Sequence, residues 1–163
     1  MKLEGSCHCQ AVRFTCESKV PIPYARCYCS ICRKTAGGGG YAINLDASRK
    51  SMRVEGRKNL SVYRARQPGS RRTGRAELSG LRRYFCKRCG SALWAVEPGS
   101  DYVHPFASAI DTPLPRPKAN LSIMLDFAAP WARVPAGRND LRSAGYGERD
   151  YDAWARKHGL SED

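Results

Sequence analysis

The sequence predicts a mainly β domain built of antiparallel sheets, and three observations lead to this fold class. Apolar residues alternate with polar ones in short segments, a pattern typical of half-buried strands. Turn-forming residues separate these segments, and fifteen glycines and ten prolines among 163 residues leave little room for long helices. The length and the 42% apolar content fit one domain with a sizeable core.

Four segments carry the strand pattern in chain order. Val12 and Phe14 alternate with Arg13 and Thr15 in the first of them. Apolar and polar residues also alternate over 41–45, while 60–63 and 121–127 are short apolar runs. Because strands of four to eight residues pair with their neighbours through short turns, these segments predict a β domain over residues 3–135.

Three other segments are predicted to be irregular or helical. Residues 65–80 are rich in arginine, glycine and serine, which predicts a mobile loop, and 113–117 is a proline-rich extended connector. Residues 136–163 form a C-terminal tail with a short helix, for which Asp150 or Asp152 is the N-cap and Gly159 the stop.

The charge distribution is uneven. The net charge is +13, and residues 49–88 contain fourteen basic residues and two acidic ones. Such a segment attracts nucleic acid or another acidic partner, or it forms a solvated face that aids solubility. The solvated face is favoured over nucleic acid, because Tyr63 is the only aromatic residue from 49 to 83 and offers no ladder for base stacking.

The eight cysteines point to metal rather than to disulfides. The start of the chain has no apolar stretch of signal-peptide type and no apolar run is long enough to span a membrane, so a cytoplasmic location is expected. Thiols stay reduced there, and metal binding becomes the first explanation for clustered cysteines. Seven of the eight fall into three groups: Cys7 and Cys9; Cys27, Cys29 and Cys32; Cys86 and Cys89.

The first and third groups together predict a structural zinc site. Cys7 and Cys9 are two apart, so on a strand they point to the same face. Cys86 and Cys89 have the spacing of a zinc knuckle, and Gly90 permits a tight turn after them. Four cysteines make a closed tetrahedral zinc site, which would hold the first strand against a late hairpin.

The middle group predicts a different metal site. Cys27, Cys29 and Cys32 supply three thiolates, and three protein ligands with one open position are typical of a catalytic zinc. Two alternatives remain at this stage. One is a second structural site completed by Cys16, His8 or His104, and the other is an iron–sulfur cluster. Candidate substrate-binding residues follow these cysteines in the chain. Arg33 and Lys34 come at once, and Gly38 and Gly39 belong to the glycine run that begins at Gly37.

At these residues the chain resembles the glutathione-dependent formaldehyde-activating family, whose namesake is S-(hydroxymethyl)glutathione synthase and which includes centromere protein V. Three ordered motifs carry the resemblance over about residues 3–133: Gly5-Ser6-Cys7-His8-Cys9-Gln10 before Val12-Arg13-Phe14, then Cys27-Tyr28-Cys29-Ser30-Ile31-Cys32-Arg33, then Phe85-Cys86-Lys87-Arg88-Cys89-Gly90-Ser91. Two residues depart from the family pattern. Gln10 replaces a usual glycine, and Tyr28 replaces a usual histidine but should point away from Cys27 and Cys29.

The resemblance implies a β-tent fold with two zinc ions per chain. It implies a structural zinc on the four outer cysteines and a catalytic zinc on Cys27, Cys29 and Cys32. It also implies a carbon–sulfur lyase activity, in which a small thiol such as glutathione adds to formaldehyde or a related aldehyde, or the reverse. The alternative is a non-catalytic zinc-binding module whose basic 49–88 segment binds nucleic acid or an acidic partner.

Overall fold

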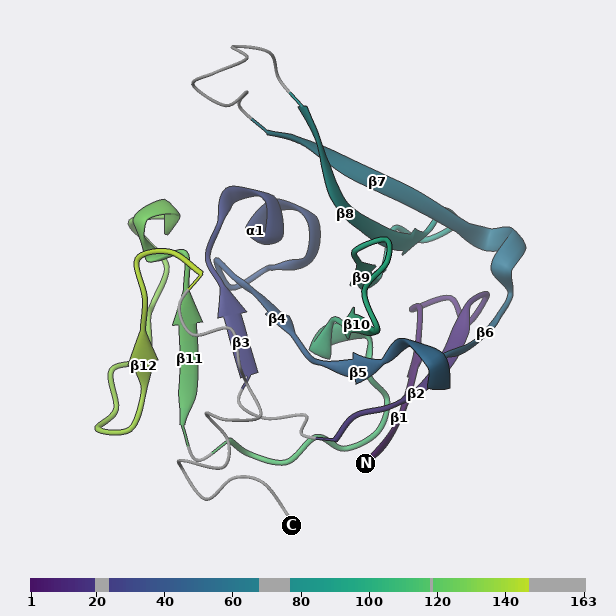
Figure 1. Cartoon of the computed structure of the whole chain (residues 1–163), viewed down its shortest axis with the longest axis horizontal. Helices are drawn as coiled ribbons and strands as arrows, with labels where there is room; N and C mark the ends of the chain where they lie inside the picture. Colours follow the sequence, from purple (N-terminus) through teal and green to yellow (C-terminus); the bar gives the residue numbers. More distant parts are fainter. Residues whose placement is uncertain (20–23, 68–76, 118, 147–163) are drawn as a thin grey trace.

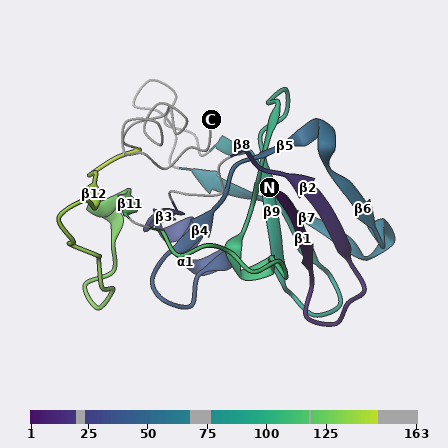
Figure 2. The ribbon, with the colours of Figure 1, turned by 90° about the horizontal axis from the view of Figure 1, so that it is seen from below.

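The computed structural model of the chain describes residues 1–19, 24–67, 77–117 and 119–146, and these form three β-sheets. A three-stranded and a four-stranded sheet lie at opposite ends of the molecule, and strand β9 (Ala92–Val96) of the five-stranded sheet lies between them (Figures 1 and 2). The mainly β prediction is therefore confirmed.

The three-stranded sheet contains the N-terminus and follows the predicted alternation. Its order is β1-β2-β6, with antiparallel pairs throughout. In β2, Phe14 and Cys16 are buried while Arg13 and Glu17 are exposed, so one face packs on the core and the other faces water. The strands are β1 (Lys2–Ser6), β2 (Arg13–Glu17) and β6 (Arg53–Glu55).

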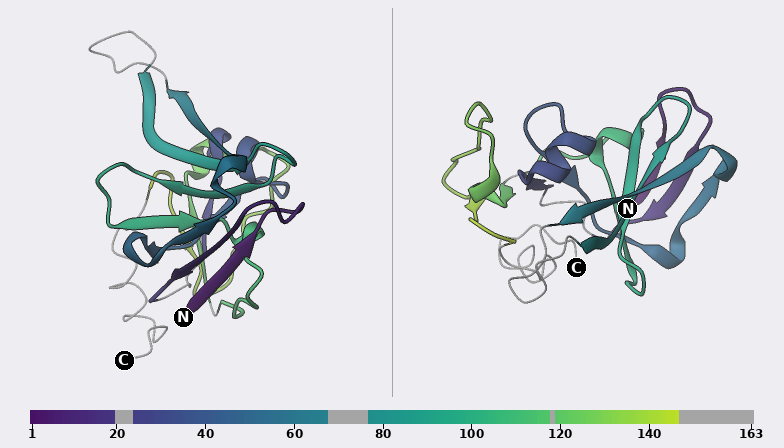
Figure 3. Two further views of the ribbon diagram at one scale, coloured as in Figure 1. Left: turned by 90° about the vertical axis from the view of Figure 1, so that its right-hand side faces the viewer. Right: turned by 90° about the horizontal axis from the view of Figure 1, so that it is seen from above.

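The five-stranded sheet is also antiparallel and has the order β5-β10-β9-β8-β7. Its long β7–β8 hairpin extends beyond the other sheets (Figure 3, left). The predicted loop over 65–80 is wrong at both ends, because strand pairing runs to Gln67 and resumes at Glu77. The remaining strands are β5 (Ala47–Ser48), β7 (Leu60–Gln67), β8 (Glu77–Cys86) and β10 (Tyr102–Pro105).

The four-stranded sheet departs from the antiparallel expectation. Its order is β12-β11-β3-β4, and β11 runs parallel to both β3 and β12. The apolar run 121–127 does not stay extended, because Met124 adopts a φ of 61° and a 3-10 turn, η4 (Leu125–Phe127), follows. The strands are β3 (Tyr24–Cys27), β4 (Ala42–Asn44), β11 (Asn120–Ile123) and β12 (Leu141–Arg142).

The described residues contain one α-helix, α1 (Ser30–Ala36), which directly follows β3. Three further 3-10 turns connect strands: η1 (Arg49–Ser51), η2 (Arg57–Asn59) and η3 (Ala107–Ala109). The predicted C-terminal helix lies outside the described residues, but the described start of the tail adds β12 to a sheet. No helix in the described part is long and apolar enough to cross a membrane.

Two buried clusters form the core. The larger one lies between the three-stranded and five-stranded sheets, where the Phe14 and Trp94 rings meet edge to face at 5.1 Å. The smaller one lies against the four-stranded sheet and contains Cys27 and Cys32 beside Phe106. Two of the three middle cysteines are therefore part of the packed interior.

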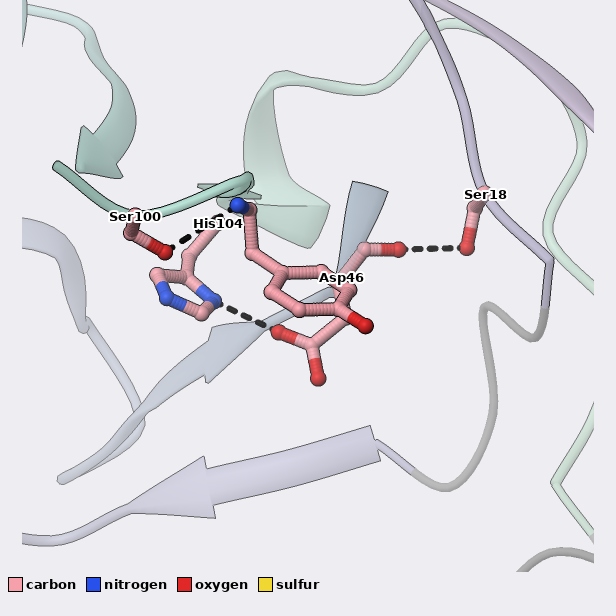
Figure 4. A network of polar contacts seen from close by, with 5 residues as sticks. Ser18, Asp46, Ser100 and His104 are labelled. Atoms are coloured by element: carbon pink, nitrogen blue, oxygen red, sulfur yellow. Dashed lines mark hydrogen bonds and ion pairs between the residues drawn. The ribbon is translucent and has the colours of Figure 1, made fainter. Parts of the chain in front are cut away.

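A polar network joins β10 to the segment before β5 (Figure 4). His104 Nδ1 lies 2.6 Å from Asp46 Oδ1, and the Ser18 hydroxyl donates to the Asp46 carbonyl at 2.5 Å. The His104 side chain is half-buried, and Asp46 is its partner within the fold.

Gly56 lies where the chain passes close to the loop that carries Cys9. Its φ is +70°, and a Cβ there would lie 1.9 Å from the Ala11 carbonyl oxygen. Gly99 is the matched control, with a φ of +86° and open space around a Cβ. We expect Gly99→Ala to destabilise the protein by about 1 kcal/mol from backbone strain alone. Gly56→Ala should cost at least about 2 kcal/mol more, because Ala11 must also move.

Urea unfolding of both variants against the wild type measures this difference directly. Equal losses of free energy in the two variants would contradict it, because both share the backbone strain and only Gly56 has the close contact.

Candidate metal centres

The structure brings the first and third cysteine groups together. Cys7 follows β1, Cys86 ends β8, and the four sulfur atoms of Cys7, Cys9, Cys86 and Cys89 lie within 4.8 Å of one another. The two members of the pair Cys7 and Cys9 approach through a turn and not along a strand, because β1 ends at Ser6. The structure therefore brings together the cysteines that the spacing grouped, but Cys7 and Cys9 meet in a turn and not on one face of a strand.

Backbone turns aim these thiols inward. Cys7 Sγ accepts a hydrogen bond from the Val12 amide at 3.3 Å, and the Cys89 thiol lies 3.3 Å from the Ser91 hydroxyl. Gln10 takes a left-handed φ of 59°, the conformation for which a glycine is suited, and its side chain donates to the Ser6 hydroxyl at 3.0 Å. Burial raises the pKa of Cys7 to about 11, whereas the hydrogen bond with Ser91 lowers that of Cys89 to about 5.

The sulfur separations fit a tetrahedral zinc. Thiolates at the zinc–sulfur distance of 2.3 Å lie about 3.8 Å apart at the corners of a tetrahedron. Cys9 Sγ lies 3.6 Å from Cys7 Sγ and 3.9 Å from Cys86 Sγ. The donor set is therefore suitable for a closed structural site.

The middle cysteines form a second group at the junction of β3 and α1. Cys27 ends β3, Cys29 is the N-cap residue of α1, and Cys32 lies in the first turn of the helix. Their three sulfur atoms also lie within 4.8 Å of one another. The Cys29 sulfur accepts a hydrogen bond from the Cys32 amide at 3.4 Å, so the helix N-terminus stabilises a thiolate there.

The three thiols share their protons unequally. Hydrogen bonds from Cys27 and Cys32 lower the pKa of Cys29 to about 2, while the same contact with Cys29 raises that of Cys27. For Cys32 the contact with Cys27 lowers the pKa, but the contact with Cys29 and burial together raise it. One thiolate thus forms readily, and a divalent cation can displace the remaining protons.

No fourth ligand joins this group among the described residues. Cys16 is buried in the larger core cluster, where burial raises its pKa to about 11, and His104 is paired with Asp46. His8 is exposed and lies beside the other cysteine group, where its amide donates to Ser91. The three residues considered as completing ligands are therefore elsewhere. Three thiols alone suit an open zinc better than an iron–sulfur cluster, which takes four.

Tyr28 points away from the thiols on either side of it. Its hydroxyl donates to the Arg133 carbonyl at 3.0 Å, and its ring lies 5.2 Å from that of Tyr41. Arg26 also alternates with Cys27 along β3, and its guanidinium lies 4.9 Å from the Tyr41 ring. The arginine and the tyrosines therefore occupy the face of the sheet opposite to Cys27.

The four candidate substrate-binding residues separate into two pairs. Arg33 and Lys34 are on α1, where Lys34 is exposed. The Arg33 Nε is buried and has no hydrogen-bond partner in the described part of the chain. Gly38 faces open space, while Gly39 lines a cavity of about 590 Å³ with Arg26, Tyr41, Trp131, Arg133, Val134 and Pro135. Because Arg26 and Tyr41 lie on the far face of the sheet, this cavity is not beside Cys27.

Two residues near the middle cysteines were not singled out from the sequence. Arg83 on β8 is only 7% exposed. The contact with Cys29 and burial raise the pKa of Cys32, and the positive charge of Arg83 opposes this rise. Partial desolvation raises the pKa of Tyr146, although its side chain is 60% exposed. The three nearby thiols raise this pKa further, and Arg83 opposes them. In the sequence Arg83 is one of fourteen basic residues in 49–88, so only its place on the buried face of β8 distinguishes it.

The other described basic residues of the 49–88 segment lie on the surface. They occupy η1, β6, η2, the two long strands of the hairpin and the turn after β8, and they are exposed: Arg49, Lys50, Arg53, Arg57, Lys58, Arg64, Arg66, Arg82, Lys87 and Arg88. This distribution agrees with a solvated face. Binding of nucleic acid or another acidic partner to this segment stays the untested alternative.

Comparison with known proteins identifies the family. The model of the family "Glutathione-dependent formaldehyde-activating enzyme" matches residues 2–122. A Halomonas elongata protein named "Putative glutathione-dependent formaldehyde-activating enzyme" is 47% identical over 163 residues, which cover 99% of both chains. The crystal structure of a Rhodobacter sphaeroides protein is similar with a TM-score of 0.50 and 27% identity, covering 71% of this chain and 93% of the other. The chain belongs to the glutathione-dependent formaldehyde-activating enzyme family.

Proposed function

We propose that this protein is a zinc-dependent carbon–sulfur lyase that adds a small thiol such as glutathione to formaldehyde or a related aldehyde, and catalyses the reverse. Two zinc ions per chain are part of the proposal. Cys7, Cys9, Cys86 and Cys89 hold the structural ion. Cys27, Cys29 and Cys32 hold the catalytic one and leave a position for substrate.

One observation carries this proposal: the same chain contains a four-thiol group with tetrahedral sulfur spacing and a three-thiol group without a fourth described ligand. A structural zinc has all four coordination positions filled by protein ligands, whereas a catalytic zinc keeps one position open for water or substrate. The family match supplies the chemical class, since its name joins glutathione with formaldehyde.

The residues around the three thiols have distinct tasks in this reaction. When bound, zinc favours the thiolate form of a thiol and polarises an aldehyde oxygen. Cys29 fixes the group to the N-terminus of α1, because its sulfur is also the helix cap. Arg33 and Lys34 lie on α1, whose first turn carries Cys32, and Gly38 follows the helix, so we assign these three to the approach of the substrate carboxylates. Gly39 lines the cavity on the other face of the sheet and is left out of this assignment.

Cellular location and domain extent are part of the same proposal. All eight cysteines are free in the structure, which suits a reducing compartment such as the cytoplasm. We assign the catalytic domain to residues 3–135, which contain both thiol groups, and residues 136–163 to a C-terminal tail.

The test is turnover of formaldehyde with glutathione by protein purified anaerobically with its metal. Production of S-(hydroxymethyl)glutathione has to exceed the uncatalysed rate, which is measured with the same metal and no protein. We expect two zinc atoms per chain and a rate that depends on both reactants. A protein with two zinc atoms and no rate above the uncatalysed reaction would refute the proposed function.

A further inference from the structure

Arg83 is a buried cation, and two of its donor atoms lack a partner among the described residues. Its side chain is 7% exposed, and its buried Nε and Nη1 atoms form no hydrogen bond within that part of the chain. Its neighbour Arg82 is exposed on the other face of β8. A buried charge without a partner is costly, so an unpaired guanidinium in a folded protein points to a missing ligand.

The side chain of Arg83 faces the three-thiol group. Its cross-strand neighbour is Ala95 on β9, and Ala95 packs in the smaller core cluster with Cys27 and Cys32. The positive charge of Arg83 also acts on Cys32, where it opposes the net rise in the pKa of that thiol. The guanidinium therefore approaches the thiols from the five-stranded sheet, while β3 and α1 carry the thiols themselves.

No acidic side chain neutralises Arg83 in the part of the chain that the structure describes. The ion pairs there join Lys2 to Glu4, Lys50 to Asp101 and His104 to Asp46. Among the described residues, the middle thiols supply the negative charge close to Arg83, and a bound reactant can supply more. Its two unpaired donors leave hydrogen-bonding capacity for that reactant.

We propose that Arg83 donates hydrogen bonds to the aldehyde oxygen while negative charge develops on it, an inference that rests on the proposed function. In the addition, a lone pair of the substrate thiolate forms the sulfur–carbon bond. The π pair of the carbonyl moves onto oxygen, and the resulting alkoxide takes a proton from water. Arg83 stays protonated throughout and contributes only electrostatic stabilisation.

The buried position of Arg83 favours this oxygen over the carboxylates of the thiol. In the S-hydroxymethyl adduct, a single carbon separates the oxygen from the reacting sulfur, so a cation next to the thiol group reaches it. The carboxylates of a glutathione-like thiol lie at the far ends of the molecule. They suit cations nearer the surface, such as Lys34 on α1.

The test compares Arg83→Met with the matched control Arg82→Met, both as zinc-loaded proteins. Methionine keeps the length of the side chain and removes its charge and donors. We expect Arg83→Met to keep two zinc atoms and a KM for glutathione within threefold of wild type, while kcat falls about 10²-fold. Arg82→Met should stay within twofold in both constants. Arg83→Lys keeps the charge but not the planar donors, and its kcat should fall about tenfold.

Several results would overturn the role of Arg83. One is an unchanged kcat with a raised KM for glutathione, which would mean that Arg83 binds a carboxylate. Another is loss of one zinc from Arg83→Met, since the guanidinium would then act on the thiols. If Arg83→Met does not fold, Arg83→Lys decides, and a wild-type kcat in that variant refutes the proposal. An inactive wild type would refute the proposed function itself, whatever the variants do.

Discussion

Replacing Cys86 with alanine is expected to lower the melting temperature of the protein by about 10 °C or more. Cys86 is fully buried, and the four-thiol group to which it belongs joins the loop after β1 to the end of β8. Metal binding at such a site contributes directly to the free energy of folding, so losing the metal costs several kcal/mol. For a chain of this length, each kcal/mol lost lowers the melting temperature by roughly 2–4 °C.

Cys16→Ala is the matched control for this prediction. Cys16 is 1% exposed but lies outside both thiol groups, so its replacement removes only a small buried side chain. We expect a loss of about 1 kcal/mol and no change in zinc content. Calorimetry and metal analysis measure both variants, and Cys86→Ala should fall from two zinc atoms to one. Similar melting temperatures for Cys16→Ala and Cys86→Ala would contradict a structural zinc at the four-thiol group.

Replacing Cys29 with serine is expected to lower turnover by about three orders of magnitude without unfolding the domain. Serine is a good N-cap, so α1 keeps the side-chain acceptor that Cys29 now provides. A serine hydroxyl is a poor zinc ligand, and two remaining thiolates do not retain the ion. We expect zinc to fall from two atoms to one, and turnover to fall about 10³-fold, since a catalytic metal contributes several kcal/mol.

The melting temperature makes this experiment specific to the middle group. Cys29→Ser should melt within about 4 °C of wild type, because the structural group is intact and the cap is conserved. Cys29→Ala removes the cap as well and should lose a further ~1 kcal/mol. A Cys29→Ser variant that keeps both zinc atoms and full turnover would show that the middle thiols are not the catalytic site.

The grouping of the cysteines could be predicted from sequence because each pair or triplet is local. Spacings of two and three residues restrict how far the sulfurs of Cys27, Cys29 and Cys32 can separate, whatever the fold. The junction of Cys7 with Cys86 across the chain followed from the need for four ligands. The alternation around Phe14 likewise reported a strand with one buried face.

Other features depended on tertiary contacts that local patterns do not contain. The parallel pairing of β11 with β3 joins residues about a hundred positions apart, and nothing in either strand specifies its direction. The 7-residue helix α1 is too short for a periodic apolar pattern, and its cap is a cysteine, not a usual capping residue. In the sequence, Arg83 cannot be distinguished from the neighbouring surface arginines and lysines. Only the alternation of faces along β8 in the folded protein places it in the interior.

The positions of the two thiol groups along the chain also set the order in which a growing polypeptide can complete them. Cys27, Cys29 and Cys32 leave the ribosome together, within a six-residue stretch. Cys9 must wait for Cys86, which lies 77 residues later. The middle thiols are therefore available to metal well before the fold that buries them can close, because long-range pairing comes late in folding. During synthesis, the site that we propose to bind substrate is the first to compete for metal.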